Sequence, residues 1–588
     1  MSARLLEQFP PVATREWEAA IHKDLKGADY AKKLIWQSEE GIAVKPYYRA
    51  EDAAGLEHLE APPGAFPYTR GTRALNEWRI REAVEAPSVA EANERARRAL
   101  ASGAGEIEFV LGARGFELRS AAELLQLLDG LGCPVHFTAG DRGAEVLRIL
   151  AGALPAGFEG SLDYDPLAED GIAGVVELVR AARARAPKFR PLTVRAFRFR
   201  DSGGTAVEEL GYALAAGIEY MAELTDGGLS AQEAAASLAF SFAAGSSFFF
   251  EIAKLRAARM LWARALEAFG VLDGGKAAIH CRTALWNKTI YDPYVNVLRG
   301  TTEAMSAAMG GCDSLSVSPF DVTYSYSDDT SRRLARNTQL ILKHEAWLDR
   351  ATDPAGGSYY TEVLTDSVAQ AAWKTMQEVA AAGGFSKAWK DGLIAGRIAK
   401  SRAAKEAAVS SRRRTILGTN QYPNAKERAL DRIARRAEDR ITPRAAEVFE
   451  AIRLRTERHA AAGGRVPVFL LLEIGNPAMR KARSGFVSNF LGCAGFEIRT
   501  ETFADAASAA KSAAASDADA VVLCSSDEEY PQIAAAVCGA VRVPVIVAGY
   551  PKDAVDQLKQ AGVTEFVHVR TNAAEFLAAW QQRLGVKE

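Results

Sequence analysis

Short apolar runs rich in β-branched and aromatic residues alternate with longer Ala- and Leu-rich helical periods from about residue 88 to residue 328. This alternation is typical of repeated βα units. The predicted strands are 107–111, 134–138, 161–165, 192–200, 278–283 and 314–318. Roughly eight units in about 240 residues favour a (β/α)8 TIM barrel over a doubly wound sheet, because no Gly-rich phosphate turn follows the first strand.

The segment 251–269 has the pattern of an outer-ring helix of such a barrel. Apolar residues recur at helical spacing, whereas Lys254, Arg256 and Arg264 fall elsewhere, and Gly270 stands where a helix C-terminus favours glycine. After the barrel, helical periods continue through about residue 464, with a polar interruption at GTNQYPN (418–424).

A second α/β alternation begins at Val466 and contains five strand-like runs with helices between them. This pattern predicts a small doubly wound domain of flavodoxin-like type, in which ligands bind beyond the carboxyl ends of the strands. The chain therefore divides into an arm (1–70), a barrel (71–360), a helical connector (361–464) and a flavodoxin-like domain (465–588).

Charge, apolar stretches and cysteine spacing exclude several classes of function. The 588 residues carry 72 Lys and Arg against 74 Asp and Glu, so the near-zero net charge argues against a nucleic-acid partner. No apolar stretch is a clean membrane span and the first residues lack the apolar core of a signal peptide, so we expect a cytoplasmic protein. The 6 cysteines are scattered, which indicates neither a disulfide framework nor a metal site.

Five long motifs resemble the adenosylcobalamin-dependent acyl-CoA mutases, specifically the methylmalonyl-CoA mutase family. They are FFFEIAKLRAARMLWARALEAFG (248–270), YDPYVNVLRGTTEAMSAAMGGCDSLSVSPFD (291–321), SRRLARNTQLIL (331–342), DPAGGSYY (353–360) and GTNQYPN. The resemblance implies a barrel threaded along its axis by CoA and capped by a cobalamin-binding domain. The family's reaction exchanges a hydrogen and a carbonyl-CoA group on adjacent carbons through an adenosyl radical.

The turn that binds cobalt in this family is altered here. Cobalamin-binding members read DxHxxG, in which the His ligates cobalt and the Asp orients its other ring nitrogen. The matching positions are Pro477 and Met479, and Glu473 replaces the preceding Lys. The elements that receive the nucleotide tail are weakened, at Ser525 and at Ala548-Gly549. The resemblance therefore predicts degenerate cofactor positions.

The barrel positions near the family's substrate differ as well. Arg73 stands at a Tyr position, Phe197 and Arg198 at a Tyr-His pair, and Asp163 at a substrate-facing Gln. Phe cannot donate a hydrogen bond, and Arg cannot exchange a proton as His can. We expect no catalytic residue at these positions.

These departures resemble the small (β) subunit of heterodimeric methylmalonyl-CoA mutases, a non-catalytic partner of a large (α) subunit that holds the adenosylcobalamin. One alternative is an active acyl-CoA mutase with atypical cobalamin binding, and another is a stand-alone CoA-ester binding or regulatory protein. His280, Arg282, Glu108, His136 and Arg198 either line a pocket or pair among themselves, for instance Arg198 with Asp163 or Glu108. Whether the barrel admits an acyl-CoA stays open.

Overall fold

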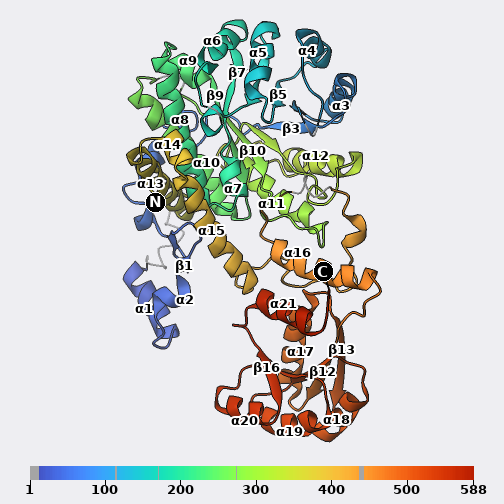
Figure 1. The fold of residues 1–588 in the computed structure, drawn as a ribbon. Helices are drawn as coiled ribbons and strands as arrows, with labels where there is room; N and C mark the ends of the chain where they lie inside the picture. Colours follow the sequence, from blue (N-terminus) through green and yellow to red (C-terminus); the bar gives the residue numbers. More distant parts are fainter. Residues whose placement is uncertain are drawn as a thin grey trace.

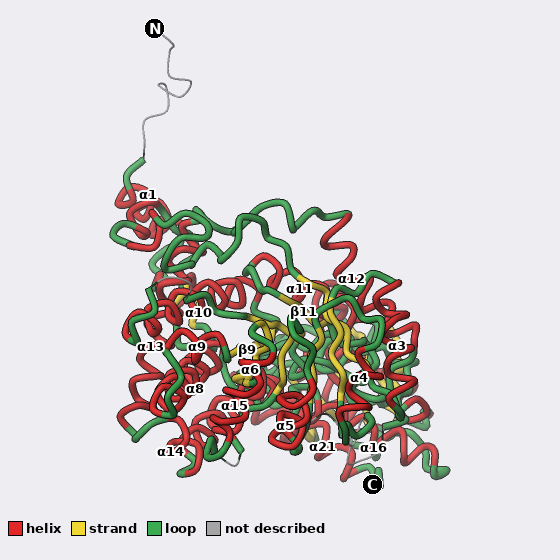
Figure 2. Tube along the Cα trace, turned by 90° about the horizontal axis from the view of Figure 1, so that it is seen from above, coloured by secondary structure: helices red, strands yellow, loops and turns green. Residues whose placement is uncertain are grey.

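The computed structural model describes residues 12–112, 115–169, 171–272, 275–435, 441 and 443–587. Its larger sheet is parallel and nine-stranded, in the order β7-β6-β5-β4-β3-β11-β10-β9-β8. The strands are β3 (Arg79–Val84), β4 (Glu106–Val110), β5 (Val135–Thr138), β6 (Glu159–Asp163), β7 (Lys188–Arg190), β8 (Leu192–Val194), β9 (Leu238–Ala244), β10 (Ile279–Thr283) and β11 (Ser314–Ser316). Seen from above, helices surround these strands (Figure 2), which confirms a TIM-type barrel.

Strands β7 and β8 are one barrel strand interrupted at Pro191, whose missing N–H leaves no donor for the ladder. β7 pairs with β6, whereas β8 pairs with β9. Thr193 closes the gap, since its N–H donates to the Tyr164 carbonyl at 2.9 Å and its hydroxyl to the Leu162 carbonyl at 2.8 Å. The nine strands therefore form a nearly closed ring.

The predicted strand over 192–200 is wrong beyond its first three residues. The chain leaves the ladder after Val194, and the helix α7 (Phe197–Asp201) begins two residues after Arg195. The side chain of Asp165 accepts the Arg195 N–H at 2.9 Å, so a carboxylate takes the place of a strand partner. This early end determines where the side chains of Phe197 and Arg198 lie.

The helices of the barrel pack outside the ring (Figures 1 and 2). They are α3 (Val89–Ala101), α4 (Ala121–Leu128), α5 (Gly143–Ala153), α6 (Val175–Arg185), α8 (Ala206–Asp226), α9 (Ala231–Ala236), α10 (Phe248–Ala268), α11 (Val295–Met309) and α12 (Asp329–His344). The first core cluster of buried apolar residues runs from Val44 to Ile398, so the following helices α13 (Tyr359–Ala381), α14 (Phe385–Lys390) and the start of α15 (Leu393–Ser410) also cover this core.

Helix α10 differs from the expected outer-ring helix because it is buried on several sides. Lys254 and Arg256 are both buried, although the pattern placed them off the apolar stripe. Helix α13 packs over α10 and brings Glu362, whose carboxylate pairs with Arg256 at 2.8 Å. Burial is tolerated because carboxylates from other elements neutralise these cations.

The second α/β unit is a five-stranded parallel sheet in the order β13-β12-β14-β15-β16, which is the flavodoxin-like order. Its strands are β12 (Val468–Ile474), β13 (Glu497–Phe503), β14 (Ala520–Cys524), β15 (Val545–Ala548) and β16 (Val563–Val567). Helices α17 (Pro477–Gly492) and α21 (Ala573–Arg583) cover one face, and α18 (Ala506–Ala515), α19 (Tyr530–Ala540) and α20 (Val555–Gln560) the other (Figure 1).

Helix α16 (Glu447–Ala461) joins the two α/β units. Its Glu450 carboxylate accepts the N–H of Ile290 at 2.8 Å, in the segment that follows β10. It also packs against α21. The smaller sheet therefore lies on the side of the barrel where the strands end (Figure 1).

The arm begins with α1 (Thr14–Asp24), α2 (Tyr30–Leu34) and the short antiparallel pair β1 (Trp36–Gln37) and β2 (Ala43–Val44). None of the residues of α1 and α2 is buried. No helix among the residues described is long and apolar enough to cross a membrane.

Candidate functional site: barrel lumen and sheet crevice

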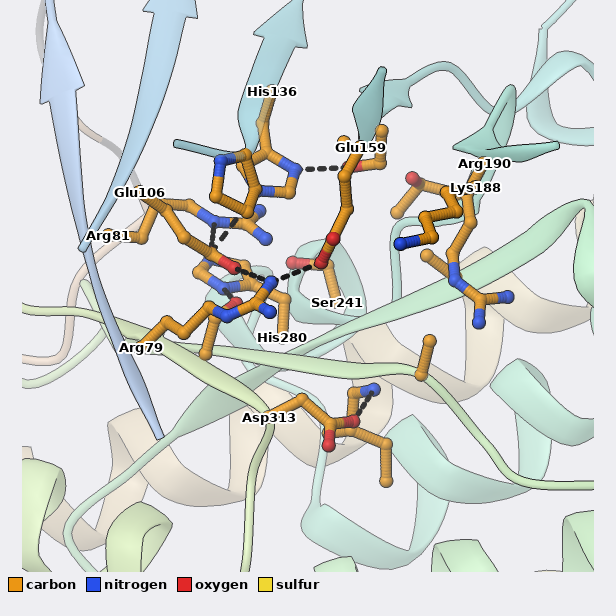
Figure 3. A pocket seen from close by; sticks show the side chains of 18 of the residues that line it. Arg79, Arg81, Glu106, His136, Glu159, Lys188, Arg190, Ser241, His280 and Asp313 are labelled. Carbon is orange, nitrogen blue, oxygen red and sulfur yellow. Dashed lines mark hydrogen bonds and ion pairs between the residues drawn. The ribbon is translucent and has the colours of Figure 1, made fainter. Parts of the chain in front are cut away.

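Charged and polar side chains fill the barrel lumen at alternate strand positions, as the two-residue period of a strand requires. A cavity of about 600 Å³ opens at the end where the strands begin, and a second of about 210 Å³ lies at the opposite end. Figure 3 shows the first cavity, with Arg79, Arg81, Glu106, His136, His280 and other polar residues around it.

Glu106 is the centre of one ion-pair cluster in the lumen. Its carboxylate lies 3.1 Å from Arg81 Nε, 3.4 Å from Arg79 Nη1 and 3.2 Å from His136 Nε2. Burial alone would raise the pKa of Glu106, but the neighbouring His136 and Arg81 hold it well below its ordinary value. Glu106 is therefore a buried carboxylate whose negative charge is balanced by Arg79 and Arg81, and it is not poised to accept a proton.

Two histidines line the lumen in the same way. The Nδ1 atom of His136 lies 2.8 Å from Ser161 Oγ, and that of His280 lies 2.8 Å from Ser314 Oγ. Burial, followed by the charge of Arg81, lowers the pKa of both imidazoles. Within the described residues, the buried Nε2 of His280 has no hydrogen-bond partner.

A layer of three charged side chains separates the two cavities. Arg81, Glu108 and Arg282 line both of them, so this layer crosses the barrel axis. Arg282 lies 3.5 Å from the Glu108 carboxylate, which also accepts the Thr138 hydroxyl at 2.5 Å. The Arg282 guanidinium stacks 4.4 Å from the Phe197 ring centroid, an arrangement that a cation and an aromatic face favour.

The rim of the larger cavity is basic on one side. Arg183, Lys188, Arg190 and Lys276 line it, and none of the four forms an ion pair with a carboxylate in the part of the chain that the structure describes. Burial lowers the pKa of Arg190, whose guanidinium donates to the carbonyls of Ala236 and Leu238. In Figure 3, Lys188 and Arg190 lie across the cavity from Arg81 and Glu106.

Two of the predicted barrel positions, Arg73 and Asp163, line the larger cavity, whereas Phe197 and Arg198 do not. Arg73 lies near the strand starts and pairs with Asp313 at 3.3 Å. Arg198 is about half exposed (47%) and pairs with Glu169 at 3.7 Å, so the predicted partners Asp163 and Glu108 are wrong for it. Turning into α7 at Phe197 carries Arg198 away from the lumen.

Arg195, which the sequence interpretation missed, is the partner of Asp163. Its Nε lies 2.8 Å from the Asp163 carboxylate, and its Nη1 lies 2.5 Å from that of Glu169. The adjacent Asp165 accepts the Tyr220 hydroxyl at 2.6 Å, and burial raises its pKa. An Arg directly after the run 192–194 was the available signal, because strand alternation places it on the same face as Thr193, two residues earlier.

Three of the predicted cofactor positions, Glu473, Pro477 and Met479, lie at the end of β12 and the start of α17. Asn476 caps α17 by accepting the N–H groups of Ala478 and Met479 at 3.0 and 3.1 Å, and Pro477 occupies the first helical position. The buried Glu473 accepts hydroxyl hydrogen bonds from Ser484 at 2.6 Å and Thr502 at 2.7 Å, and pairs with Lys481 at 2.8 Å.

The crevice between β12 and β14 is where the sheet order reverses, and this chain's own side chains occupy it. The Ser525 hydroxyl lies 2.6 Å from the Glu529 carboxylate. The Tyr530 hydroxyl donates to the Ala548 carbonyl at 2.6 Å. The Arg483 guanidinium lies against Gly549, where it would contact a Cβ at 3.1 Å.

The residues of this crevice do not fit a cobalamin. A thioether at Met479 is a weak ligand for an oxidised cobalt, and Pro477 offers no side-chain acceptor to orient one. At the predicted tail positions, the Ser525 hydroxyl is engaged by Glu529 and the Arg483 guanidinium lies against Gly549. Among the residues described, no group of three His, Cys, Asp or Glu side chains could hold a metal ion.

The fold is that of an α/β protein with a nearly closed parallel barrel and a second, five-stranded parallel sheet, and comparison with known proteins gives its family. The sequence model of the methylmalonyl-CoA mutase family matches residues 37–113 and 164–464. The chain is 40% identical to the methylmalonyl-CoA mutase small subunit of Porphyromonas gingivalis, over 99% of both chains. It is 34% identical to the small subunit of Streptomyces virginiae, over 99% of this chain and 98% of that one.

The protein therefore belongs to the methylmalonyl-CoA mutase family. It is also 31% identical to the protein named methylmalonyl-CoA mutase large subunit in Streptomyces virginiae, over 77% of this chain and 67% of that one. Small and large subunits are thus both relatives of this chain, and the small subunits align with it over nearly its whole length.

Proposed function

We propose that this chain is the non-catalytic small subunit of an adenosylcobalamin-dependent methylmalonyl-CoA mutase. Similarity to small subunits over 99% of the chain supports this assignment. The complex would isomerise (R)-methylmalonyl-CoA to succinyl-CoA, and the large subunit would hold the cofactor. A heterodimer of two related chains follows, because homologous surfaces can pair about a pseudo-twofold axis.

The lumen carries the argument for a non-catalytic role. The charged groups between its two cavities pair with one another or with nearby carboxylates, as Arg81 does with Glu106 and Arg282 with Glu108. A substrate that followed the barrel axis, as the family resemblance implies, would have to break the second pair and leave a buried charge unpaired. In this proposal the barrel fold serves to bind the large subunit, because that contact needs the folded surface of this chain and not a path through its lumen.

Co-expression with the large chain of a methylmalonyl-CoA mutase tests the proposal. We expect the two chains to elute together in a 1:1 complex and to turn over (R)-methylmalonyl-CoA, whereas this chain alone should be inactive. Arg198→Ala, at the family's His position, should leave kcat of the complex unchanged because this exposed side chain contacts no substrate here. The matched change in the large chain, His→Ala at the corresponding position, should reduce kcat.

Turnover by this chain alone with added adenosylcobalamin would contradict the proposal in favour of an active mutase. Elution as a monomer or homodimer, with no effect on the large chain, would instead favour a stand-alone binding or regulatory protein.

A further inference from the structure

One oxygen of Glu529 receives an unusual concentration of hydrogen-bond donors. Within 3.3 Å of Oε2 lie the Ser525 hydroxyl (2.6 Å), the Ser526 hydroxyl (2.8 Å), the Asn476 N–H (3.1 Å) and the Ser526 N–H (3.3 Å). These donors come from two separate turns, one after β12 and one after β14. Together they form a nest of the kind that binds a carboxylate or phosphate oxygen.

The turn after β12 is shaped to admit this carboxylate. Gly475 adopts a φ of +74°, and a Cβ at this position would overlap all the carboxylate atoms of Glu529. Only glycine combines this backbone conformation with the missing side chain. The Glu529 carboxylate therefore occupies the space left by the missing side chain of Gly475, in the crevice between β12 and β14.

The hydrogen bond from Ser525, joined by those from Asn476 and Ser526, lowers the pKa of Glu529 to about 2. The carboxylate is therefore ionised at neutral pH. The rest of the crevice is closed by Arg483, which pairs with Asp527 at 2.9 Å and covers Gly549. The same crevice thus contains an anion and a cation from the chain itself.

We infer that the crevice of the small sheet is a preformed carboxylate-binding site whose permanent occupant is the side chain of Glu529. The occupant completes the hydrogen bonding of the two turns and closes the crevice to an external ligand. This inference deepens the proposed function, since a self-occupied crevice is compatible with a subunit that takes no cofactor there.

Chemical rescue of Glu529→Ala tests the inference on the full chain. The substitution empties the nest, so we expect the midpoint of thermal unfolding to fall by about 2–4 °C. Sodium acetate should restore part of this loss in a saturable way, because acetate supplies the missing carboxylate, whereas sodium chloride at equal ionic strength should not. Acetate should have no such effect on the wild-type chain.

Glu528→Ala is the matched control, because the neighbouring Glu528 is exposed and contacts no donor of the nest. Its midpoint of thermal unfolding should be close to that of the wild type and should not change when acetate is added. If Glu529→Ala does not fold, Glu529→Gln replaces it, with a lower midpoint and no acetate effect because its amide still fills the nest.

An unchanged midpoint in Glu529→Ala, or equal responses to acetate and chloride, would overturn the inference. These outcomes leave the proposed function untouched as long as the chain still forms a 1:1 complex with the large subunit. Conversely, successful rescue in a chain that forms no complex with the large subunit would keep the inference and remove the proposed function.

Discussion

His280 illustrates how a single lumen side chain connects burial to pH. Its imidazole is buried, its Nδ1 is held by Ser314, and burial places its pKa well below the ordinary value of 6.5. Below about pH 6.5, therefore, the imidazole of His280 is protonated in the unfolded chain but stays neutral in the folded chain. By linkage, the free energy of unfolding decreases as the pH falls through this range, by at most about 1.4 kcal/mol per pH unit for one group.

Replacing His280 by Asn should reduce this pH dependence. The midpoint of thermal unfolding of the wild-type chain should fall between pH 7 and pH 5, and that of His280→Asn should fall less, with His136 accounting for part of the remaining slope. His344→Gln, on the exposed last turn of α12, should follow the wild-type curve. A curve for His280→Asn parallel to the wild type would contradict the assignment of a buried neutral imidazole.

At the residue scale, strand alternation predicted part of the lumen and family resemblance predicted the altered positions. Glu108, His136, His280 and Arg282 do line the barrel, since each stands at an inward position of its strand. The partner of Arg198 could not be predicted, because a side chain follows the backbone into α7 and away from the lumen. Ser526 and Glu529 have the Ser-x-x-Glu spacing of a helix start, but the hydrogen bond from Asn476 could not be predicted because this residue is more than 50 positions away.

At the scale of elements, α8 and α10 are joined by a buried charge. The Lys254 ammonium lies 2.6 Å from the Glu209 carboxylate of α8 and 2.5 Å from that of Glu251 in α10. All three side chains are buried. Removing the cation would leave two buried carboxylates facing each other, which is the costly way to break such a cluster.

Lys254→Met should therefore lower the free energy of unfolding by about 3–5 kcal/mol, measured by urea denaturation. Arg264→Met is the control on the same helix, because this Arg is about half exposed (45%) and pairs only with side chains near the surface. Its effect should stay within about 0.5 kcal/mol. A loss below about 1 kcal/mol for Lys254→Met would contradict the account of α10.

Periodicity predicted whether a segment is a helix or a strand more readily than it predicted which other elements pack against that segment. The barrel and the five-stranded sheet were predicted because their strands are short apolar runs between helical periods. Periodicity could not show that one barrel strand is interrupted at Pro191. The two halves of this strand, β7 and β8, pair with different neighbours. Periodicity also could not show that α13 covers α10, because burial of Arg256 depends on a carboxylate over 100 residues away.

At the scale of the whole molecule, the chain keeps the architecture of a mutase, while its own side chains cross the barrel between two cavities and also occupy the crevice of the small sheet. Arg282 and Glu108 cross the barrel axis, and Glu529 and Arg483 close the crevice of the small sheet. The two closures are independent, because they lie in different sheets and use different residues. Both features support the proposed small-subunit role, in which the folded surface is what this chain contributes.

Equilibrium dialysis of the purified chain against adenosylcobalamin tests this account most directly. We expect no cobalamin on the protein side beyond the free concentration and an unchanged visible spectrum, for the wild type and also for Pro477→Asp with Met479→His, because Glu529 and Arg483 still fill the crevice. Stoichiometric binding by the wild-type chain, with a spectrum shifted by a new cobalt ligand, would contradict the account.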